Sequence, residues 1–169
     1  EGEDIRRYRD EVMKRMEQKA RYAEKEHITL LNENELDIYG ESPEGCADII
    51  ATVNSPALRT CFDPANFIMV GIKPFDHAYP LLRDSIEYFH IKDAFPRGTP
   101  GRPETCVVAG EGEGQIRETL SDFAVFSRDR NTFLSLEPHL ANAGQFAGFS
   151  GPDKFIAAAR ALKKILAAL

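Results

Sequence analysis

Four polar residues, each at the end of a short apolar run, could together form one divalent-metal site: Glu33, Asp63, His90 and Glu137. Each run has the length of a β-strand and is rich in β-branched or aromatic residues, and helix-patterned sequence follows it. Repeating strand–helix units predict parallel strands, and the C-terminal ends of parallel strands share one edge. Three carboxylates and one imidazole would converge at that edge. Such a ligand set suits manganese, magnesium or cobalt.

The elements that must position these residues alternate regularly along the chain. The pattern predicts helices over residues 3–26, 42–53, 75–82 and 115–126, and a last helix after residue 151. Strands are predicted over residues 27–32, 58–62, 85–89 and 132–136. Segments 63–74, 90–113 and 137–151 are expected to be loops, and the second is unusually long for a compact domain. Ser42 is a suitable N-cap, with Pro43 at the first helical position.

Two architectures accommodate four parallel strands with helices between them. One is an open, doubly wound sheet, which usually carries a glycine-rich phosphate turn after its first strand. Here that turn is the acidic segment Glu33–Glu35. The other is half of an eight-stranded barrel, in which functional residues lie at successive strand ends. We therefore expect an α/β fold of the TIM-barrel type: a half-barrel of four parallel strands with flanking helices, forming one domain over residues 1–169.

Composition excludes several classes of partner. The formal net charge of −6 and the lack of a Lys/Arg block argue against nucleic acid. No apolar stretch approaches the roughly 20 residues of a membrane span. Three cysteines at irregular spacing fit neither a disulfide framework nor a zinc motif, which favours a cytoplasmic protein with reduced thiols. Because a helix begins almost at once, without an initiator Met, we expect that a preceding strand is missing.

The predicted loops hold further polar residues, each with two interpretations. Lys92 and Asp93 could form an internal ion pair, or could act as an electrophile and the group that orients it. Asn66 could hydrogen-bond a substrate hydroxyl or cap the loop. Glu111 belongs to a glycine-rich segment whose carboxylates would repel phosphate, so a flexible loop or lid is expected. His139 could face the site or the solvent.

Five segments resemble the sugar isomerase/epimerase superfamily, the xylose isomerase-like (β/α)8 barrels. They read LNENE (31–35), FDPAN (62–66), YFHIKD (88–93), GEGEG (110–114) and LSLEPH (134–139). The resemblance covers nearly the whole chain and follows the order and spacing of the last four barrel strands. It implies that the chain is the C-terminal half of such a barrel, with strands five to eight.

The resemblance also implies the metal ligands. The family's ligands end strands five to eight, and the matching positions are Glu33, Asp63, His90 and Glu137. Manganese is the first expectation, with magnesium or cobalt as alternatives and zinc less favoured. The substrate would be a sugar or polyol, and the further contacts expected with it come from Asn66, Asp93, Glu111 and His139.

Two catalytic routes stay open within the family. In the epimerase branch two ligating glutamates lie on opposite faces of the carbon that loses its proton, which would assign those roles to Glu33 and Glu137. A cation stabilises the oxygen that gains charge, while one carboxylate removes the proton and the other returns it. Lys92 could instead polarise the carbonyl, as lysines near the metal do in the hydride-shift branch.

The leading function is thus a metal-dependent sugar isomerase or epimerase. A lyase of the same superfamily, such as an inosose or dehydroshikimate dehydratase, is an alternative. Asn66 stands where the DNA-repair endonuclease branch carries a histidine, which argues against a nuclease. A third reading is a non-catalytic, truncated half-barrel. Its open strand edges and uncovered apolar face would favour a homo-oligomer or association with a missing N-terminal half-barrel.

Overall fold

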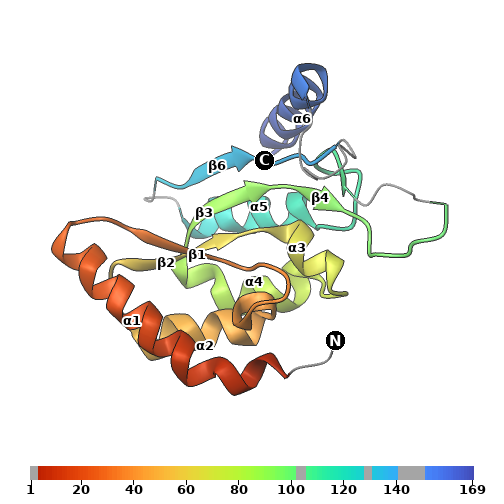
Figure 1. Ribbon diagram of the computed structural model, residues 1–169. Helices are drawn as coiled ribbons and strands as arrows, with labels where there is room; N and C mark the ends of the chain where they lie inside the picture. Colours follow the sequence, from red (N-terminus) through yellow and green to blue (C-terminus); the bar gives the residue numbers. More distant parts are fainter. Residues whose placement is uncertain (1–3, 102–105, 128–130, 141–150) are drawn as a thin grey trace.

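A four-stranded parallel sheet forms the centre of the protein (Figure 1), in a computed structural model that describes residues 4–101, 106–127, 131–140 and 151–169. Its strands are β1 (Leu30–Glu33), β2 (Leu58–Phe62), β3 (Ile86–Ile91) and β6 (Phe133–Leu136). They lie in the order β1–β2–β3–β6, so each pairs with the next one along the chain. A doubly wound sheet would reverse its order at a switch point. The sequential order confirms the predicted half-barrel arrangement.

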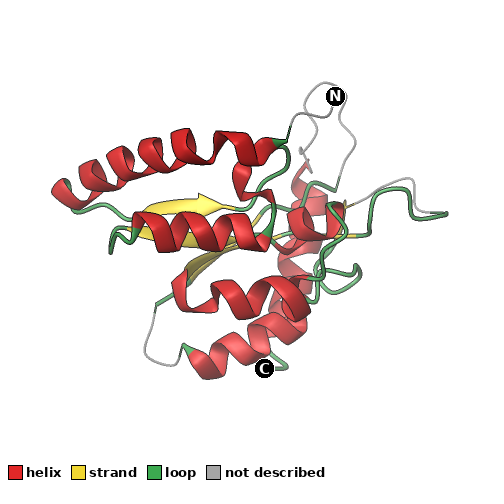
Figure 2. Ribbon diagram, turned by 90° about the horizontal axis from the view of Figure 1, so that it is seen from below, coloured by secondary structure: helices red, strands yellow, loops and turns green. Residues whose placement is uncertain are grey.

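Helices cover one face of this sheet (Figure 2). The α-helices are α1 (Arg9–Lys25), α2 (Pro43–Val53), α3 (Pro64–Met69), α4 (Tyr79–Leu82), α5 (Ile116–Phe126) and α6 (Gly151–Leu166). Single turns of other helix types span Ile5–Tyr8, Tyr39–Glu41, Pro74–Ala78 and Arg83–Ser85. None of the helices in the described ranges is long and apolar enough to cross a membrane. The predicted cap of α2 is confirmed, because the Ser42 hydroxyl accepts a hydrogen bond from Gly45 N at 3.1 Å.

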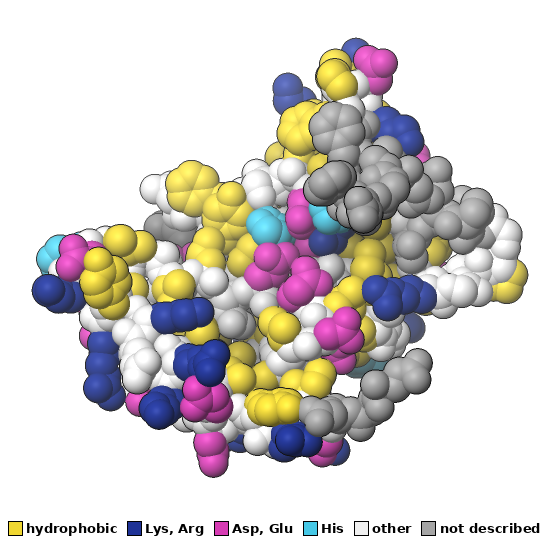
Figure 3. All heavy atoms as spheres, viewed as in Figure 1, with side chains coloured by type: hydrophobic (Ala, Val, Ile, Leu, Met, Phe, Trp, Pro, Cys, Tyr) yellow, Lys and Arg dark blue, Asp and Glu magenta, His cyan; other side chains and the backbone are white. Residues whose placement is uncertain are grey.

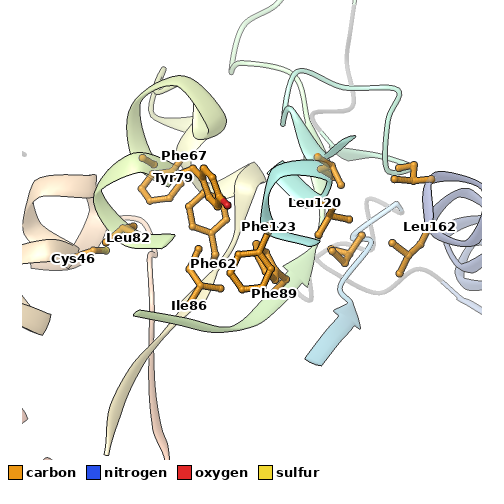
Figure 4. Packing of buried hydrophobic residues seen from close by; sticks show 14 residues of the cluster. Cys46, Phe62, Phe67, Tyr79, Leu82, Ile86, Phe89, Leu120, Phe123 and Leu162 are labelled. Carbon is orange, nitrogen blue, oxygen red and sulfur yellow. The ribbon is translucent and has the colours of Figure 1, made fainter. Parts of the chain in front are cut away.

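The main core lies between the sheet and the helices (Figure 4). Phe62 of β2 and Phe89 of β3 are fully buried, with ring centroids 5.8 Å apart. Phe123 of α5 meets Phe89 edge-on at 5.0 Å. Such aromatic pairs contribute about 0.5–1.5 kcal/mol beyond the burial of their area. These contacts fix β2 and β3, the central strands, against the helical layer.

The opposite face of the sheet is open. Side chains alternate between the two faces of a strand. In β1, Leu30 packs toward the helices, so its neighbour Leu31 lies on the open face, where it is 37% exposed. In β6, Leu134 packs into the core and Phe133 is 69% exposed, stacked on Tyr88 with ring centroids 5.9 Å apart. Apolar groups therefore line this open face in the N-terminal halves of β1 and β6.

The structure corrects three of the predicted boundaries. Segment 63–74, predicted as a loop, begins with helix α3. His90 was expected just after a strand but lies inside β3, because Ile91 still pairs with Leu136 of β6. The long loop after His90 contains a short antiparallel pair, β4 (Asp93–Ala94) and β5 (Cys106–Val107). Residues 141–150 of the predicted glycine-rich loop lie outside the described residues.

Candidate metal centre

The four predicted ligands meet at the C-terminal edge of the sheet. One side-chain donor atom from each of Glu33, Asp63, His90 and Glu137 lies within 4.8 Å of all the others. His90 Nδ1 is 2.9 Å from Glu33 Oε1, 3.2 Å from Glu137 Oε2 and 3.9 Å from Asp63 Oδ2. Figure 3 shows acidic and histidine side chains gathered near the middle of the visible face. Four neighbouring strands thus supply one compact cluster of three carboxylates and an imidazole.

Asp63 holds its place because it has two structural tasks. As the N-cap of α3, its Oδ1 accepts a hydrogen bond from Asn66 N at 3.1 Å, and Pro64 occupies the first helical position. Its backbone N–H donates to Asn34 Oδ1 at 2.9 Å. These bonds fix the carboxylate and leave Oδ2 to face the cluster.

Asp63 Oδ2 is the atom that best fits a bound cation. The side chain is 0% exposed, and within the described part of the chain no donor is oriented to hydrogen-bond this oxygen. It lies 2.9 Å from the Lys92 ammonium, as an ion pair only. The Lys92 ammonium offsets part of the cost of burying this charge, and a metal ion would offset the rest. The three carboxylates and one ammonium carry a formal charge of −2, which a divalent ion would neutralise.

Lys92 is buried between two of the ligands. Its side chain is 3% exposed, and Nζ lies 2.9 Å from Asp63 Oδ2 and 3.1 Å from Glu137 Oε2. Burial alone would lower the pKa of this lysine, but the carboxylates of Asp63 and Glu137 outweigh it and raise the pKa above its ordinary value. Burial likewise raises the pKa of the Asp63 carboxyl, against the opposing pull of Lys92. Lys92 therefore stays a cation at neutral pH.

His90 and Glu137 shift each other's pKa through their contact. Hydrogen bonds with Cys61, Glu137 and Glu33, in that order of effect, raise the pKa of His90 to about 12. The hydrogen bond from His90 lowers the pKa of Glu137 to about 2, with Lys92 adding to the effect. The cluster thus favours positive charge at the position of the His90 ring. A metal ion would supply that charge itself, since a ligating histidine must be neutral.

Asn34 is a positioning residue that the sequence interpretation missed. Its fully buried amide donates to Asp63 O at 2.9 Å and accepts from Asp63 N at 2.9 Å, as a strand partner would. Asn66 Nδ2 in turn donates to Asn34 O at 2.8 Å and lies 3.4 Å from Glu33 Oε1. The two asparagines tie the ends of β1 and β2 together. An asparagine directly after a predicted ligand was the only signal for this in the sequence.

The residues predicted to contact substrate divide into two groups. Asn66 is buried beside Glu33, and His139 Nε2 lies 3.2 Å from Glu137 Oε1, so both border the cluster. Asp93 turns instead into the glycine-rich loop, where its oxygens accept backbone hydrogen bonds. Glu111 is exposed on that loop, and in the described ranges no recorded contact joins it to the four ligands. A substrate role for these four residues stays a prediction.

The chain belongs to the xylose isomerase-like TIM barrel family, whose model matches residues 1–165. No curated protein sequence matches this chain significantly. Among solved structures, a xylose isomerase-like TIM barrel protein from Mycobacterium smegmatis in complex with magnesium superposes with a TM-score of 0.71 at 17% identity. That match covers 100% of this chain and 54% of the other.

Two further similar structures are those of proteins named for two different activities. The probable 3-DHS dehydratase AsbF of Bacillus anthracis, involved in petrobactin synthesis, has a TM-score of 0.68 at 18% identity, over 94% of this chain and 57% of its own. D-Psicose 3-epimerase of Clostridium cellulolyticum H10, solved with D-tagatose, has a TM-score of 0.62 at 15% identity, over 98% and 57%. The chain thus spans just over half the length of these proteins. At such identities the likeness establishes the fold and leaves the reaction open.

Proposed function

We propose that this chain carries the metal centre of a sugar or polyol isomerase or epimerase, with manganese as the preferred ion. The observation that carries the proposal is the buried Asp63 carboxylate. Its Oδ2 has no hydrogen bond among the described residues, and the side chain offers an oxygen within 4.8 Å of donor atoms on Glu33, His90 and Glu137. Oxygen-rich sets with one imidazole suit manganese, magnesium or cobalt better than zinc. When bound, the ion would act as a Lewis acid toward a substrate oxygen.

Glu33 and Glu137 are the proposed proton-transfer pair. Both contact His90 Nδ1, at 2.9 Å and 3.2 Å, so the two carboxylates flank a common position from the two outer strands, β1 and β6. A carbon held between them could lose its proton to one carboxylate and regain it from the other, which inverts its configuration. Both side chains are partly exposed, so substrate can reach them.

Lys92 does not act as a base in the proposed route. Because its pKa is raised, it does not accept a proton at neutral pH. We propose that it holds the carboxylates of Asp63 and Glu137 in place and adds positive charge near the reacting oxygen. This role makes Lys92 an electrostatic group and leaves the proton transfer to the glutamates.

Calorimetric titration with Mn²⁺ tests the centre itself. One ion should bind per chain, and Glu33→Gln or Glu137→Gln should weaken binding at least about 10-fold, because each removes a charged ligand. Glu35→Gln is the matched control, since Glu35 is an exposed glutamate two residues along and lies outside the cluster. Unchanged affinity in both ligand variants would refute the centre.

Proton NMR in D2O tests the reaction. With Mn²⁺ and a panel of ketoses and inososes, proton transfer predicts deuterium incorporation at the carbon next to the carbonyl. A hydride shift would give isomer without deuterium, and a dehydratase would give an unsaturated product with water released. The similarity to a probable dehydratase makes this last outcome the main alternative. Deuterium incorporation that survives Glu33→Gln and Glu137→Gln would contradict the assigned pair.

We further propose that four more βα units cover the open face of the sheet. When the chain is alone in solution, a second copy of it supplies these units. The exposed Leu31 and Phe133 on that face support this, as do related barrels of nearly twice the length. The complementary N-terminal half-barrel would fill the same place where it is present. Free thiols at Cys46, Cys61 and Cys106 favour a cytoplasmic setting for this assembly.

Sedimentation at micromolar concentration tests the association. The chain should sediment as a dimer or larger species, and Phe133→Lys should shift it toward monomer by placing charge in the apolar interface. Val125→Lys is the matched control, because Val125 is similarly exposed but lies on α5 in the helical layer. A compact monomer for the parent chain would count against the proposal.

A further inference from the structure

Cys61 places a thiol within the proposed metal centre. It lies on β2, two residues before Asp63, so both side chains project from the same face of the strand. In the sheet it is the direct partner of Glu33 on β1. Its Sγ, a carboxylate oxygen of Glu33 and a ring nitrogen of His90 all lie within 4.8 Å of one another. A second group of three ligand atoms therefore shares Glu33 and His90 with the first.

We propose that Glu33, Cys61 and His90 form an alternative site for a thiophilic divalent cation, with Cd²⁺ or Zn²⁺ as the ions of matching chemistry. It rests on the proposed centre for its two shared ligands. Carboxylate, thiolate and imidazole are all ligands that Zn²⁺ accepts, at about 2.0–2.3 Å, and thiolates favour softer ions over Mn²⁺ or Mg²⁺. On binding, the Cys61 thiol and the protonated His90 ring each release a proton to solvent as their bonds to the metal form, with no change in oxidation state.

The cysteine does not stand alone in this proposal. Asp63 Oδ2, fully buried and without a hydrogen bond among the described residues, lies 3.9 Å from His90 Nδ1. It belongs to the other group of ligand atoms, so a water molecule would complete the four-coordinate set that zinc-type ions prefer around Glu33, Cys61 and His90. The Cys61 side chain itself is 3% exposed, so water is largely kept from the sulfur. The site thus combines a soft donor, one carboxylate and an imidazole in a sheltered position.

The consequence is a competition between two classes of cation. Both ligand sets need Glu33 and His90, so one chain cannot hold a soft ion and a hard ion on these residues together. A thiophilic ion would therefore displace Mn²⁺ from the proposed centre and leave Glu137 without a metal contact. The thiol gives the centre a built-in sensitivity to soft metals that an oxygen-only centre would lack.

Titration of the full chain with Cd²⁺, followed by thiolate-to-cadmium absorption in the ultraviolet, tests the proposal without any activity measurement. The absorption should grow and saturate at one ion per chain. It should vanish in Cys61→Ser, and Cd²⁺ affinity should fall at least about 10-fold. Cys106→Ser is the matched control, because that cysteine lies on β5, outside the set, and the absorption should persist.

A variant that keeps Cys61 as the sole cysteine, with Cys46→Ala and Cys106→Ala, guards against a folding defect in Cys61→Ser. It should retain the full absorption and one-to-one stoichiometry. No absorption in this variant, or absorption that survives Cys61→Ser, overturns the proposal. Parallel Mn²⁺ titrations separate the two hypotheses: Mn²⁺ binding without a cadmium–thiolate signal refutes the thiol site alone, and loss of both refutes the centre.

Discussion

Two buried aspartates near the same edge of the sheet, Asp63 and Asp93, have opposite hydrogen-bonding states. Asp93 accepts four backbone hydrogen bonds at 2.8–3.0 Å, two on each carboxylate oxygen. Asp63 accepts one, on Oδ1, and among the described residues its Oδ2 has no hydrogen bond, with the Lys92 ammonium at 2.9 Å and His90 Nδ1 at 3.9 Å. A carboxylate whose acceptors are all occupied holds the chain in place. A carboxylate with an acceptor left over, next to two other acids, is available to a ligand.

The loop around Asp93 is built for this anchoring role. Its amide donors come from Gly110, Gly112 and Gly114, which alternate along the GEGEG segment. A Cβ on Gly112 would clash with Asp93 Oδ1 and with the backbone of Ala94, and Gly114 is nearly as tight. Gly110 has a φ of +89°, which side chains rarely adopt. The glycines let three amides approach one carboxylate, so the loop encloses an internal anion.

The largest expected effect is on metal binding by Asp63→Asn. This variant should weaken Mn²⁺ binding about 100-fold or more, since it removes a buried, charged ligand from the cluster. The free energy of unfolding should change by less than about 1 kcal/mol, because the amide oxygen can still cap α3 and the buried Lys92 keeps Glu137 as its ion-pair partner. Calorimetry and urea unfolding measure the two quantities. Strong destabilisation with intact Mn²⁺ binding would place Asp63 with the structural acids.

Asp93→Asn should show the reverse pattern. An amide can accept at only one of its two terminal atoms, so two of the four hydrogen bonds are lost. At about 1.5–3 kcal/mol for each bond to a charged acceptor, we expect the free energy of unfolding to fall by about 3 kcal/mol. Mn²⁺ affinity should stay within about threefold of the parent. If Asp93→Asn loses Mn²⁺ binding but keeps its stability, the contrast between the two aspartates fails.

Asn34→Ala sharpens the comparison by removing the support of Asp63 without touching a ligand. The change deletes both hydrogen bonds between the Asn34 amide and the Asp63 backbone. Loss of such supporting partners typically costs 10–100-fold in metal affinity, and we expect about 30-fold here. Asn32→Ala is the matched control, because the Asn32 amide nitrogen makes no hydrogen bond among the described residues. Equal effects of the two variants would deny Asn34 its positioning role.

The meeting of the four candidate ligands could be predicted from the sequence because each depends only on a local strand and the acid or histidine near its end. Parallel pairing then brings the ends together without further information. The role of Asp93 could not be predicted in the same way, since three of its partners lie 17–21 residues away across a loop. The role of Asn34 could not be predicted either, because it depends on contact with Asp63 at the end of the neighbouring strand. Cys61 was accessible in principle, because a spacing of two from Asp63 places both on one strand face.

The ends of strands and helices were likewise predicted well only where the signal is local. The strand β2 was predicted at its observed limits, since an apolar run with a proline soon after it is a local signal. Helix α3 was missed although Asp63-Pro64 is a good start signal, because the segment is only one and a half turns long. Strand β3 was predicted too short, since pairing with β6 extends it through His90 and Ile91. Tertiary pairing, absent from local sequence, decides such ends.

The buried thiol of Cys46 extends the comparison from the two carboxylates to a group that keeps its proton. The Sγ donates to Gly40 O at 3.0 Å, and burial raises the pKa of this thiol to about 12. In the unfolded chain the thiol ionises near its ordinary pKa of about 9. Since the folded pKa is the higher one, the contribution of the thiol to stability is complete below pH 9 and is lost as pH rises toward 12.

The free energy of unfolding of the parent, compared with that of Cys46→Ala, isolates this smallest effect. The advantage of the parent should be constant from pH 7 to 8 and about 1.4 kcal/mol smaller at pH 10, because only the unfolded thiol releases its proton. Lysines and tyrosines titrate in both proteins, so their contributions cancel in the difference. A difference that stays flat to pH 10 would mean that Cys46 ionises in the fold. Burial and the hydrogen bond to Gly40 O would then be insufficient to keep the thiol protonated in the fold.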